Sequence, residues 1–352
     1  MNNLNVEKSV TWQCPSNLAI VKYWGKYGKQ LPQNASISMT LKEAKTITTL
    51  SWESKKNNDQ NIALSFLFDG EKNKAFESKL TKFLTSIAID YFPFLMNYEL
   101  TIISKNTFPH SSGIASSASS MGALALCLCT MEKNILRNNV SDVEFIQKAS
   151  HIARLGSGSA SRSVIGHWAM WGLHPNFSEA NNEYAVDLTP SVHPIFNSLK
   201  NDILIVSAEK KSVSSTAGHQ LMENNPYAMA RYAQANQRIV QLYSALQTGD
   251  VESFGMIAEA EALTLHALMM CSEPSYMLME PASLAIIKKI RSFRADTKLP
   301  VYFSLDAGPN IHLLYPENIS LQVQTLIDQD LLSQCQNFQV IRDGIGVGPS
   351  IL

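Results

Sequence analysis

The sequence predicts an α+β protein of two domains. Its 352 residues are enough for one large or two ordinary domains, and a hydrophobic content of 45% with 17% charged residues indicates a sizeable core. Strand-like and helix-like patterns occur in both halves, and a stretch rich in Pro and Asn at residues 174–194 lies between them. We therefore expect an N-terminal domain at residues 1–190 and a C-terminal domain at residues 191–352.

The first half begins with strands. Residues 9–14, the alternating pattern at residues 36–41 and residues 46–52 after it are typical of strands, as are residues 98–106. A loop of Pro, Ser and Gly then leads into a helix. Residues 142–153 predict a further helix, because Ser141 and Glu144 have the spacing of a capping box.

The second half repeats this mixture. Residues 202–209 form a continuous apolar run typical of a buried strand, and residues 226–246 carry apolar side chains at helical spacing before Gly249. Residues 254–269 predict another helix. Residues 301–305 and 311–315 predict two strands around the tight turn DAGPN.

Charge and apolar content exclude several classes of protein. The formal net charge of -1 provides no general basic field for nucleic acid or membranes, so a site for an anionic substrate must gather its cations locally. No secretory signal is evident, and the longest strongly apolar run, residues 121–131, is too short to span a bilayer. Five cysteines without a CxxC spacing indicate reduced thiols, and so a cytoplasmic location.

The segment FPHSSGIASSASSMGALAL at residues 108–126 predicts a phosphate-binding loop. Free N–H groups at a helix N-terminus attract anions, serine hydroxyls add donors, and glycine lets the backbone come close. No Lys follows the glycine, so the loop is not of the GxxxxGK[ST] type. A Ser-rich helix cap packed on a sheet is the alternative. The candidate ATP-binding residues are Ser111, Ser112, Gly113, Ala115, Ser116 and Ser117.

Three other segments carry candidate polar groups. In residues 17–41, Lys22, Lys26 and Lys29 crowd around two aromatic residues, which suits an oxyanion; a solvated basic loop is the alternative. In RLGSGSASRS, residues 154–163, Gly and Ser lie between two arginines, whose guanidinium groups match a carboxylate or phosphate. Asp306 follows a strand at a tight corner, where an Asp is commonly only a turn residue.

The eight histidines show no metal-ligand spacing, and we predict no metal held by protein side chains alone. Any metal should be Mg²⁺ that arrives with a nucleotide and is held by oxygen ligands and phosphates.

Taken together, these segments resemble the GHMP kinase superfamily, and within it the diphosphomevalonate decarboxylases. The resemblance covers residues 14–349 and rests on NLAIVKYWGK, FPHSSGIASSAS, ARLGSGSASRS, KKSVSST, the EAxxxHA-type stretch at residues 261–267, DAGPN and GIGVGP in that order. It implies a GHMP kinase-like fold with an N-terminal domain like ribosomal protein S5 domain 2, a ferredoxin-like C-terminal domain, and the active site in the interdomain cleft.

The resemblance also implies a reaction. ATP, with Mg²⁺, would phosphorylate the C3 hydroxyl of (R)-5-diphosphomevalonate, after which phosphate and CO₂ leave and isopentenyl diphosphate and ADP remain. Asp306 would be the catalytic carboxylate, Lys22 would pair with it, and Arg162 would hold the carboxylate that leaves as CO₂. The substrate-binding residues implied are Tyr23, Trp24, Gly25, Lys26, Ser157, Gly158, Ser159, Ala160, Ser161, Arg162, Ser215 and Thr216. Relatives are usually homodimers.

The chain departs from the family pattern at Ser161, where Cys is common, and the basic residue after the first hairpin is not evident; Lys72, Lys74 and Lys79 are candidates. Phosphomevalonate decarboxylase and mevalonate 3-kinase therefore stay open as alternatives on the same fold. A ligand sensor without catalysis is an alternative of another class.

Overall fold

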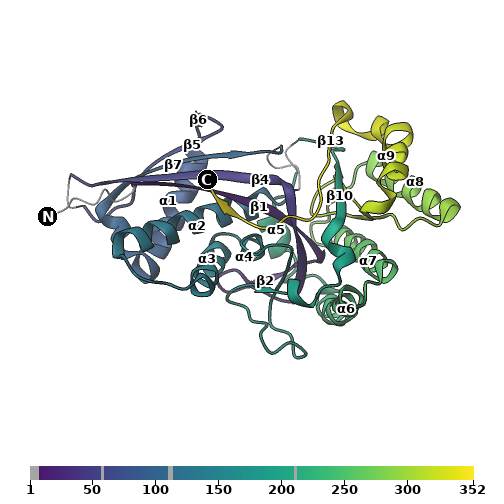
Figure 1. The fold of residues 1–352 in the computed structure, drawn as a ribbon, viewed down its shortest axis with the longest axis horizontal. Coiled ribbons are helices and arrows are strands. Elements are labelled where there is room, and N and C mark those ends of the chain that lie inside the picture. The colour runs from purple at the N-terminus through teal and green to yellow at the C-terminus, as the bar shows by residue number, and fades with distance from the viewer. Residues whose placement is uncertain (1–7, 57–58, 110–113, 210–211) are drawn as a thin grey trace.

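The structure is a computed structural model, which describes residues 8–56, 59–109, 114–209 and 212–352. An N-terminal lobe built on a long sheet and a C-terminal lobe rich in helices lie end to end (Figure 1). Both lobes mix strands and helices, so the predicted α+β class is correct.

The N-terminal lobe contains an eight-stranded sheet, counted over the described residues. Along its main path the order is β14-β1-β4-β7-β5-β6, and β8 pairs with β4 and β9. The strands are β1 (Ser9–Val21), β4 (Ser36–Ser54), β5 (Ala63–Phe68), β6 (Glu71–Lys72), β7 (Tyr98–Asn106), β8 (Trp168–Trp171), β9 (Val186–Asp187) and β14 (Ser350–Ile351). The two strands predicted at residues 36–41 and 46–52 are one strand, β4, whose residues alternate between buried and partly exposed after residue 43. Its inner face packs against helices, which explains that period of two.

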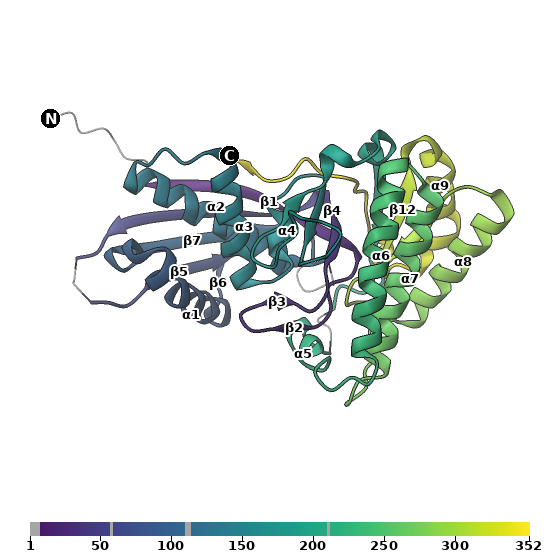
Figure 2. The ribbon, with the colours of Figure 1, turned by 90° about the horizontal axis from the view of Figure 1, so that it is seen from below.

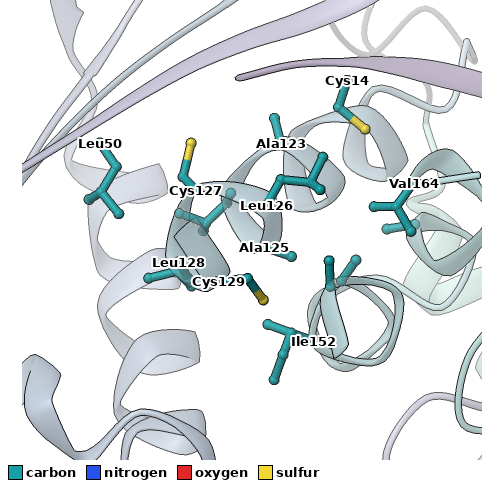
Figure 3. Close-up of a cluster of buried hydrophobic side chains, with 14 of the residues drawn as sticks. Cys14, Leu50, Ala123, Ala125, Leu126, Cys127, Leu128, Cys129, Ile152 and Val164 are labelled. Atoms are coloured by element: carbon teal, nitrogen blue, oxygen red, sulfur yellow. The ribbon is translucent and has the colours of Figure 1, made fainter. Parts of the chain in front are cut away.

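Helices cover one face of this sheet. They are α1 (Lys74–Tyr91), α2 (Ser116–Leu136), α3 (Asp142–Gly156) and α4 (Ala160–Ser163). Helix α2 is apolar on nearly all sides and is buried between the sheet and α3, with Leu126 and Cys127 fully buried (Figure 3). The capping box expected at α3 is present: the Glu144 N–H donates to Ser141 Oγ at 3.3 Å, and the Ser141 N–H donates to Glu144 Oε2 at 3.0 Å. The capping box fixes where α3 begins, and the candidate site lies at the other end of this helix, beside Gly156, and at the start of α2.

The C-terminal lobe packs helices on a smaller sheet of order β11-β12-β10-β13. Its strands are β10 (Leu199–Leu204), β11 (Tyr302–Ser304), β12 (Ile311–Pro316) and β13 (Val340–Ile341). Its helices are α5 (Ser215–Gln220), α6 (Ala228–Thr248), α7 (Val251–Met270), α8 (Pro281–Thr297) and α9 (Ser320–Leu326). Gly249, with a φ of 77°, ends α6 as predicted, and α6, α7 and α8 lie side by side in Figure 2.

The chain crosses between the lobes twice. Residues 174–194 are a packed connection rather than an open linker, because they contain β9 and the buried Ala180 and Ala185. The chain end returns to the N-terminal lobe, where β14 pairs with β1. Asp343 accepts hydrogen bonds from the backbone N–H groups of residues 42–44, which adds a buried tie between the lobes. The domain boundary near residue 190 therefore stays a prediction. The last strand, β14, belongs to the sheet of the N-terminal lobe.

Among the described residues, no helix is both long and apolar enough to cross a membrane.

Candidate active site

A cavity of about 210 Å³ lies where the two lobes meet. From the N-terminal lobe it is lined by the end of β1 with the following loop, by the start of α2 and by the segment between α3 and α4. From the C-terminal lobe it is lined by α5, by Leu265 of α7 and by the corner after β11. Segments that are far apart in the sequence therefore meet in one place, at the boundary that the resemblance implied.

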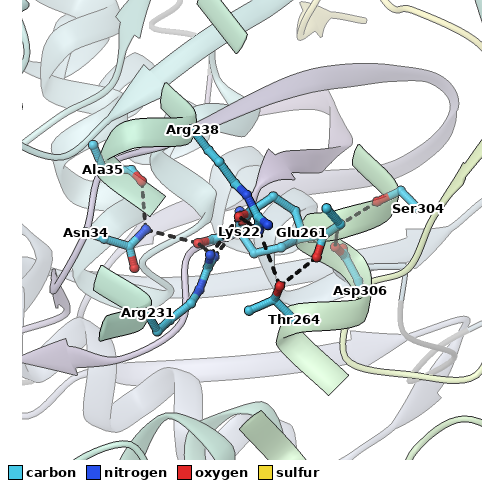
Figure 4. A network of polar contacts seen from close by, with 10 residues as sticks. Lys22, Asn34, Ala35, Arg231, Arg238, Glu261, Thr264, Ser304 and Asp306 are labelled. Carbon is cyan, nitrogen blue, oxygen red and sulfur yellow. Dashed lines mark hydrogen bonds and ion pairs between the residues drawn. The ribbon is translucent and has the colours of Figure 1, made fainter. Parts of the chain in front are cut away.

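Lys22 and Asp306 form an ion pair in this cavity, as the resemblance implied. Lys22 follows β1 and Asp306 follows β11, and Lys22 Nζ lies 2.8 Å from Asp306 Oδ1. The ammonium also donates to Ser304 Oγ at 2.9 Å (Figure 4). The Lys22 side chain is 2% exposed and that of Asp306 is 20% exposed. The carboxylate therefore reaches the cavity while the ammonium behind it is shielded from water.

Arg162 is a buried cation whose hydrogen-bond partners are neutral. Its Nε and Nη1 donate to Ser38 and Ser36 at 3.0 and 2.7 Å, and Nη2 donates to Asn17 Oδ1 at 3.3 Å. Within the part of the chain that the structure describes, no carboxylate forms a salt bridge with it. Burial lowers the pKa of Arg162 to about 10, while Asp306 and Tyr23 act in the opposite direction, so the group stays charged at neutral pH. A buried, charged guanidinium that lines a cavity without a counter-ion is suited to an anionic ligand.

Hydroxyl groups line the wall beside Arg162. The Tyr23 hydroxyl is buried and has no hydrogen-bond partner among the described residues. Its ring is fixed by Trp171 and His219, with centroid distances of 4.8 and 4.4 Å. Burial raises the pKa of Tyr23, and nearby arginines only partly oppose this, so the hydroxyl keeps its proton and can donate to a ligand. Further lining residues are Ser157, Gly158, Ser159, Ser215 and Thr216.

A short hairpin brings Lys26 to the cavity. Strands β2 (Lys26–Tyr27) and β3 (Leu31–Pro32) form it, and Lys26 Nζ donates to Gln30 Oε1 at 3.1 Å. Partial burial lowers the pKa of Lys26. Trp24 lines the same wall and packs against His219, with ring centroids 4.5 Å apart.

Arg154 does not flank the cavity, contrary to the sequence-based interpretation of residues 154–163. Its Nη2 pairs with Glu183 at 2.6 Å and its Nη1 donates to the Lys29 carbonyl at 2.6 Å. It therefore anchors the hairpin, and of the two arginines in that segment only Arg162 is part of the cavity wall.

A second cavity, of about 440 Å³, adjoins the first along Ala115, Ser117, Gly156, Ser215 and Thr216. Its walls carry Ser116 and, mostly, aromatic and aliphatic side chains such as those of Phe66, Phe68, Phe76, Leu80, Phe83 and Met121. Flat apolar walls suit a nucleobase, and the shared serine-rich rim beside the first turn of α2 suits phosphates. The two cavities together therefore offer walls of the kinds that suit the base and the phosphates of a nucleotide. Ser111, Ser112 and Gly113 lie outside the described residues.

Among the described residues, no group of three or more His, Cys, Asp or Glu side chains gathers into a metal site. Mg²⁺ would therefore need phosphate oxygens among its ligands, which is usual for a metal that accompanies a nucleotide. Of the three candidate lysines after the first hairpin, Lys79 lines the second cavity, whereas Lys72 and Lys74 line neither.

Three of the residues expected to bind substrate lie behind the cavity wall. Gly25 has a φ of 98°, and a Cβ there would meet the Tyr232 hydroxyl at 2.2 Å. Ala160 is fully buried, and Ser161 Oγ donates to the Gly158 carbonyl at 2.9 Å. Gly25 lies in the connection between β1 and β2, and Ala160 and Ser161 lie in α4, so each supports neighbouring lining residues from behind.

The sequence interpretation missed seven lining residues: Asn17, Ala19, Gln30, Gly156, His219, Leu265 and Ala307. Asn17 lies in an apolar strand, where a polar side chain signals an inward polar contact, and it bonds Arg162. His219 Nδ1 accepts the Gly25 N–H at 3.0 Å. No local pattern indicates that His219 contacts a loop almost two hundred positions earlier.

Comparisons with known proteins agree over most of the chain. Residues 14–181 match the family model described as the diphosphomevalonate decarboxylase-like N-terminal domain, and residues 202–344 match that of the mevalonate 5-diphosphate decarboxylase C-terminal domain. The diphosphomevalonate decarboxylase of Ganoderma lucidum is 31% identical over 94% of this chain and 83% of its own length.

Solved structures show the same likeness. The mevalonate diphosphate decarboxylase from Staphylococcus aureus has a TM-score of 0.82 and 27% identity, with 98% of each chain covered. A structure described as MDDEF in complex with MVAPP, AMPPCP and magnesium has a TM-score of 0.81 and 26% identity, with 98% of each chain covered. The predicted two-domain GHMP kinase-like fold is thus confirmed.

Proposed function

The chain belongs to the diphosphomevalonate decarboxylase family, and we propose that it carries out that family's reaction in the cavity around Lys22, Arg162 and Asp306. The enzyme is an ATP-dependent carboxy-lyase. It converts (R)-5-diphosphomevalonate and ATP into isopentenyl diphosphate, CO₂, ADP and phosphate.

The observation that carries this assignment at the site is the position of Arg162. A charge held in a buried wall without a counter-ion costs desolvation energy, and a bound carboxylate would offset that cost. The Lys22–Asp306 pair lines the same cavity, so an acid bound at Arg162 places its neighbouring carbon atoms near Asp306. Arg162 would therefore bind the substrate carboxylate, and Asp306 would contact the reacting hydroxyl.

In the first step, the C3 hydroxyl oxygen attacks the γ-phosphorus of ATP and ADP leaves. A tertiary alcohol is a weak nucleophile, so most of the rate must come from positioning and from charge stabilisation. Asp306 accepts the hydroxyl proton, and the Lys22 ammonium, 2.8 Å from Asp306 Oδ1, supplies positive charge beside the reacting centre.

In the second step, the C3–O bond breaks, phosphate leaves, and positive character develops at C3. The electron pair of the C1–C2 bond then forms the C2=C3 double bond while CO₂ departs. The leaving phosphate takes up the proton that Asp306 accepted, so the Asp306 carboxylate is again negative and stabilises the developing charge at C3. Arg162 holds the substrate carboxylate in line until the C1–C2 bond breaks.

The remaining lining groups support the two phosphate-bearing ligands. The Tyr23 hydroxyl, Lys26, Ser157, Ser159 and Thr216 would bind the diphosphate. The nucleotide would place its base in the second cavity and its phosphates along the rim at Ala115, Ser116 and Ser117, with Lys79 beside it. Phosphate oxygens at the serine-rich rim would hold Mg²⁺, which would supply positive charge that offsets theirs.

The proposed location is the cytoplasm, and the proposed assembly is a homodimer. All five cysteines are free thiols, and four of them are buried, which fits the reducing cytoplasm. The homodimer expected from the resemblance is checked by sedimentation of the purified protein.

The experiment that tests the function supplies pure protein with MgATP and, in separate reactions, mevalonate, its 5-phosphate or its 5-diphosphate. We expect equal release of CO₂, ADP and phosphate from the 5-diphosphate. CO₂ from the monophosphate alone would make the protein a phosphomevalonate decarboxylase. ADP without CO₂ would make it a 3-kinase, and binding without turnover would make it a sensor.

A further inference from the structure

Helix α7 contacts the backbones of both members of the Lys22–Asp306 pair. Glu261 Oε2 accepts the Lys22 backbone N–H at 2.8 Å. Five residues further along the helix, the His266 ring contacts the Asp306 carbonyl, with Nε2 3.1 Å from the oxygen. Because that helix advances about 1.5 Å per residue, the two contacts lie about 7.5 Å apart along its axis.

The Glu261 contact is part of a buried ionic network. Its two carboxylate oxygens each lie 2.6 Å from a nitrogen of the Arg231 guanidinium, and Arg238 Nη1 donates to Oε1 at 2.6 Å. Arg231 also donates from Nη2 to the Lys22 carbonyl at 3.1 Å, and Asn34 donates to that carbonyl at 3.0 Å (Figure 4). Both polar groups of the Lys22 peptide are therefore held, on one side of the cavity, by helices of the C-terminal lobe.

His266 is a neutral donor to the carbonyl of Asp306. The ring is 1% exposed, and burial lowers its pKa to about 4, an effect that contact with the Asp306 carbonyl only partly opposes. A carbonyl oxygen can only accept, so the proton of the neutral ring lies on Nε2. His266 thus fixes the backbone at the corner from which the Asp306 carboxylate projects, without adding charge to the cavity.

If Glu261, Arg231 and His266 only stabilised the fold, they would not need to bond the backbones of Lys22 and Asp306 in particular. A buried ion pair commonly adds little to stability, because desolvation offsets its attraction. Here Glu261 accepts a hydrogen bond from the backbone of Lys22, whose ammonium pairs with the Asp306 carboxylate. On the same helix, His266 donates to the backbone carbonyl of Asp306. Lys22 belongs to the N-terminal lobe and Asp306 to the C-terminal lobe. Helix α7 contacts both of these residues.

We propose that Glu261, Arg231 and His266 are positioning residues, which make α7 a template that sets the separation and direction of the Lys22 ammonium and the Asp306 carboxylate. The proposal rests on the function assigned above and adds residues that do not touch the reacting atoms. Small errors in such geometry are costly, since a displacement of about 1 Å can reduce a rate about 100-fold.

The first test compares His266→Leu with His266→Gln. Leucine removes the donor, whereas glutamine carries an amide N–H at a similar reach. We expect kcat to fall about 10- to 100-fold in His266→Leu with little change in either KM, and to recover to within about threefold of wild type in His266→Gln. A merely structural role would lower the unfolding temperature of both variants without this split between kcat and KM.

His312 provides the matched control. It is also a buried neutral histidine and is close enough to Lys22 and Asp306 for their charges to affect its pKa, but its Nδ1 lies 3.0 Å from Asn201 Oδ1 and its ring forms no hydrogen bond with either residue among those described. His312→Leu should lose stability and keep kcat within about threefold of wild type. If it lowers kcat as much as His266→Leu, or if His266→Gln restores nothing, the proposal for His266 is wrong.

The second test uses the two arginines that share Glu261. Only Arg231 also bonds the Lys22 carbonyl, whereas Arg238 bonds Thr264 Oγ1 at 3.3 Å. Arg231→Lys should reduce kcat at least about tenfold more than Arg238→Lys does, with KM for both substrates nearly unchanged. Equal effects of the two substitutions would refute the template. Failure of wild-type enzyme to release CO₂ would refute the assigned function instead, so the two outcomes are distinguishable.

Discussion

Replacement of Arg162 by leucine should separate activity from stability. Truncating one partner of a buried, hydrogen-bonded charge pair typically costs about 2–5 kcal/mol. At about 1.4 kcal/mol per factor of ten, kcat/KM for the 5-diphosphate should fall about 30- to 4,000-fold.

The same replacement should have two opposing effects on the stability of the free protein. Leucine removes the hydrogen bonds from Arg162 to Ser36, Ser38 and Asn17, each worth about 1.5–3 kcal/mol because one partner is charged. It also removes a buried charge whose desolvation costs several kcal/mol. These two effects have opposite signs, so the free energy of unfolding should change by no more than about 2 kcal/mol.

Two assays check this prediction. Steady-state release of CO₂ and ADP gives kcat/KM, and thermal unfolding is measured with and without mevalonate 5-diphosphate. At a ligand concentration near 100 times Kd, wild type should gain about 2.7 kcal/mol of stability, and Arg162→Leu should gain much less at that concentration. Arg162→Lys, which keeps the charge but loses the planar fork, should be intermediate. An Arg162→Leu enzyme with kcat/KM within threefold of wild type would refute the role of this guanidinium.

Three further predictions concern other groups of the site. Asp306→Ala should abolish release of both CO₂ and ADP while a fluorescent ATP analogue still binds with unchanged Kd; measurable turnover would exclude Asp306 as the reacting carboxylate. Gly158→Ala should raise KM for the organic substrate about tenfold and leave KM for ATP unchanged, since the new Cβ would lie 2.8 Å from the Tyr23 hydroxyl; kinetics with each substrate varied in turn measure this split. Burial lowers the pKa of His266 and of His312 to about 4 from an ordinary 6.5, so the unfolded chain takes up protons first, and denaturant titrations should show stability falling between pH 6.5 and about 4. His312→Gln should flatten that fall, and an unchanged slope would contradict the assignment.

The local elements were accessible from the sequence because their signals are local. The capping box at Ser141 and Glu144 and the Gly249 stop are set by neighbouring residues, and both occur where expected. Strand β4 was divided in two because Lys42 and Glu43, which are exposed, interrupt the apolar alternation. The pairing of β14 with β1 could not be foreseen, since a two-residue strand has no pattern of its own.

The site was accessible only in part, for a related reason. Lys22, Arg162 and Asp306 lie in segments with dense Gly, Ser and Lys signals, and the resemblance related them to one another. Arg154 borders the same Gly- and Ser-rich segment as Arg162, yet in the folded protein it forms an ion pair with Glu183 instead of lining the cavity. Glu261 and His266 belong to the stretch at residues 261–267 that supports the resemblance, but no spacing in the sequence indicates that they bond backbone groups of Lys22 and Asp306.

The most direct test of the central claim is a crystal structure of the protein with mevalonate 5-diphosphate and a non-hydrolysable ATP analogue. The substrate carboxylate should lie on the Arg162 guanidinium, and the C3 hydroxyl should lie within hydrogen-bond distance of Asp306, with Lys22 still paired to it. A substrate whose carboxylate points away from Arg162, or whose C3 hydroxyl is out of reach of Asp306, would contradict the account.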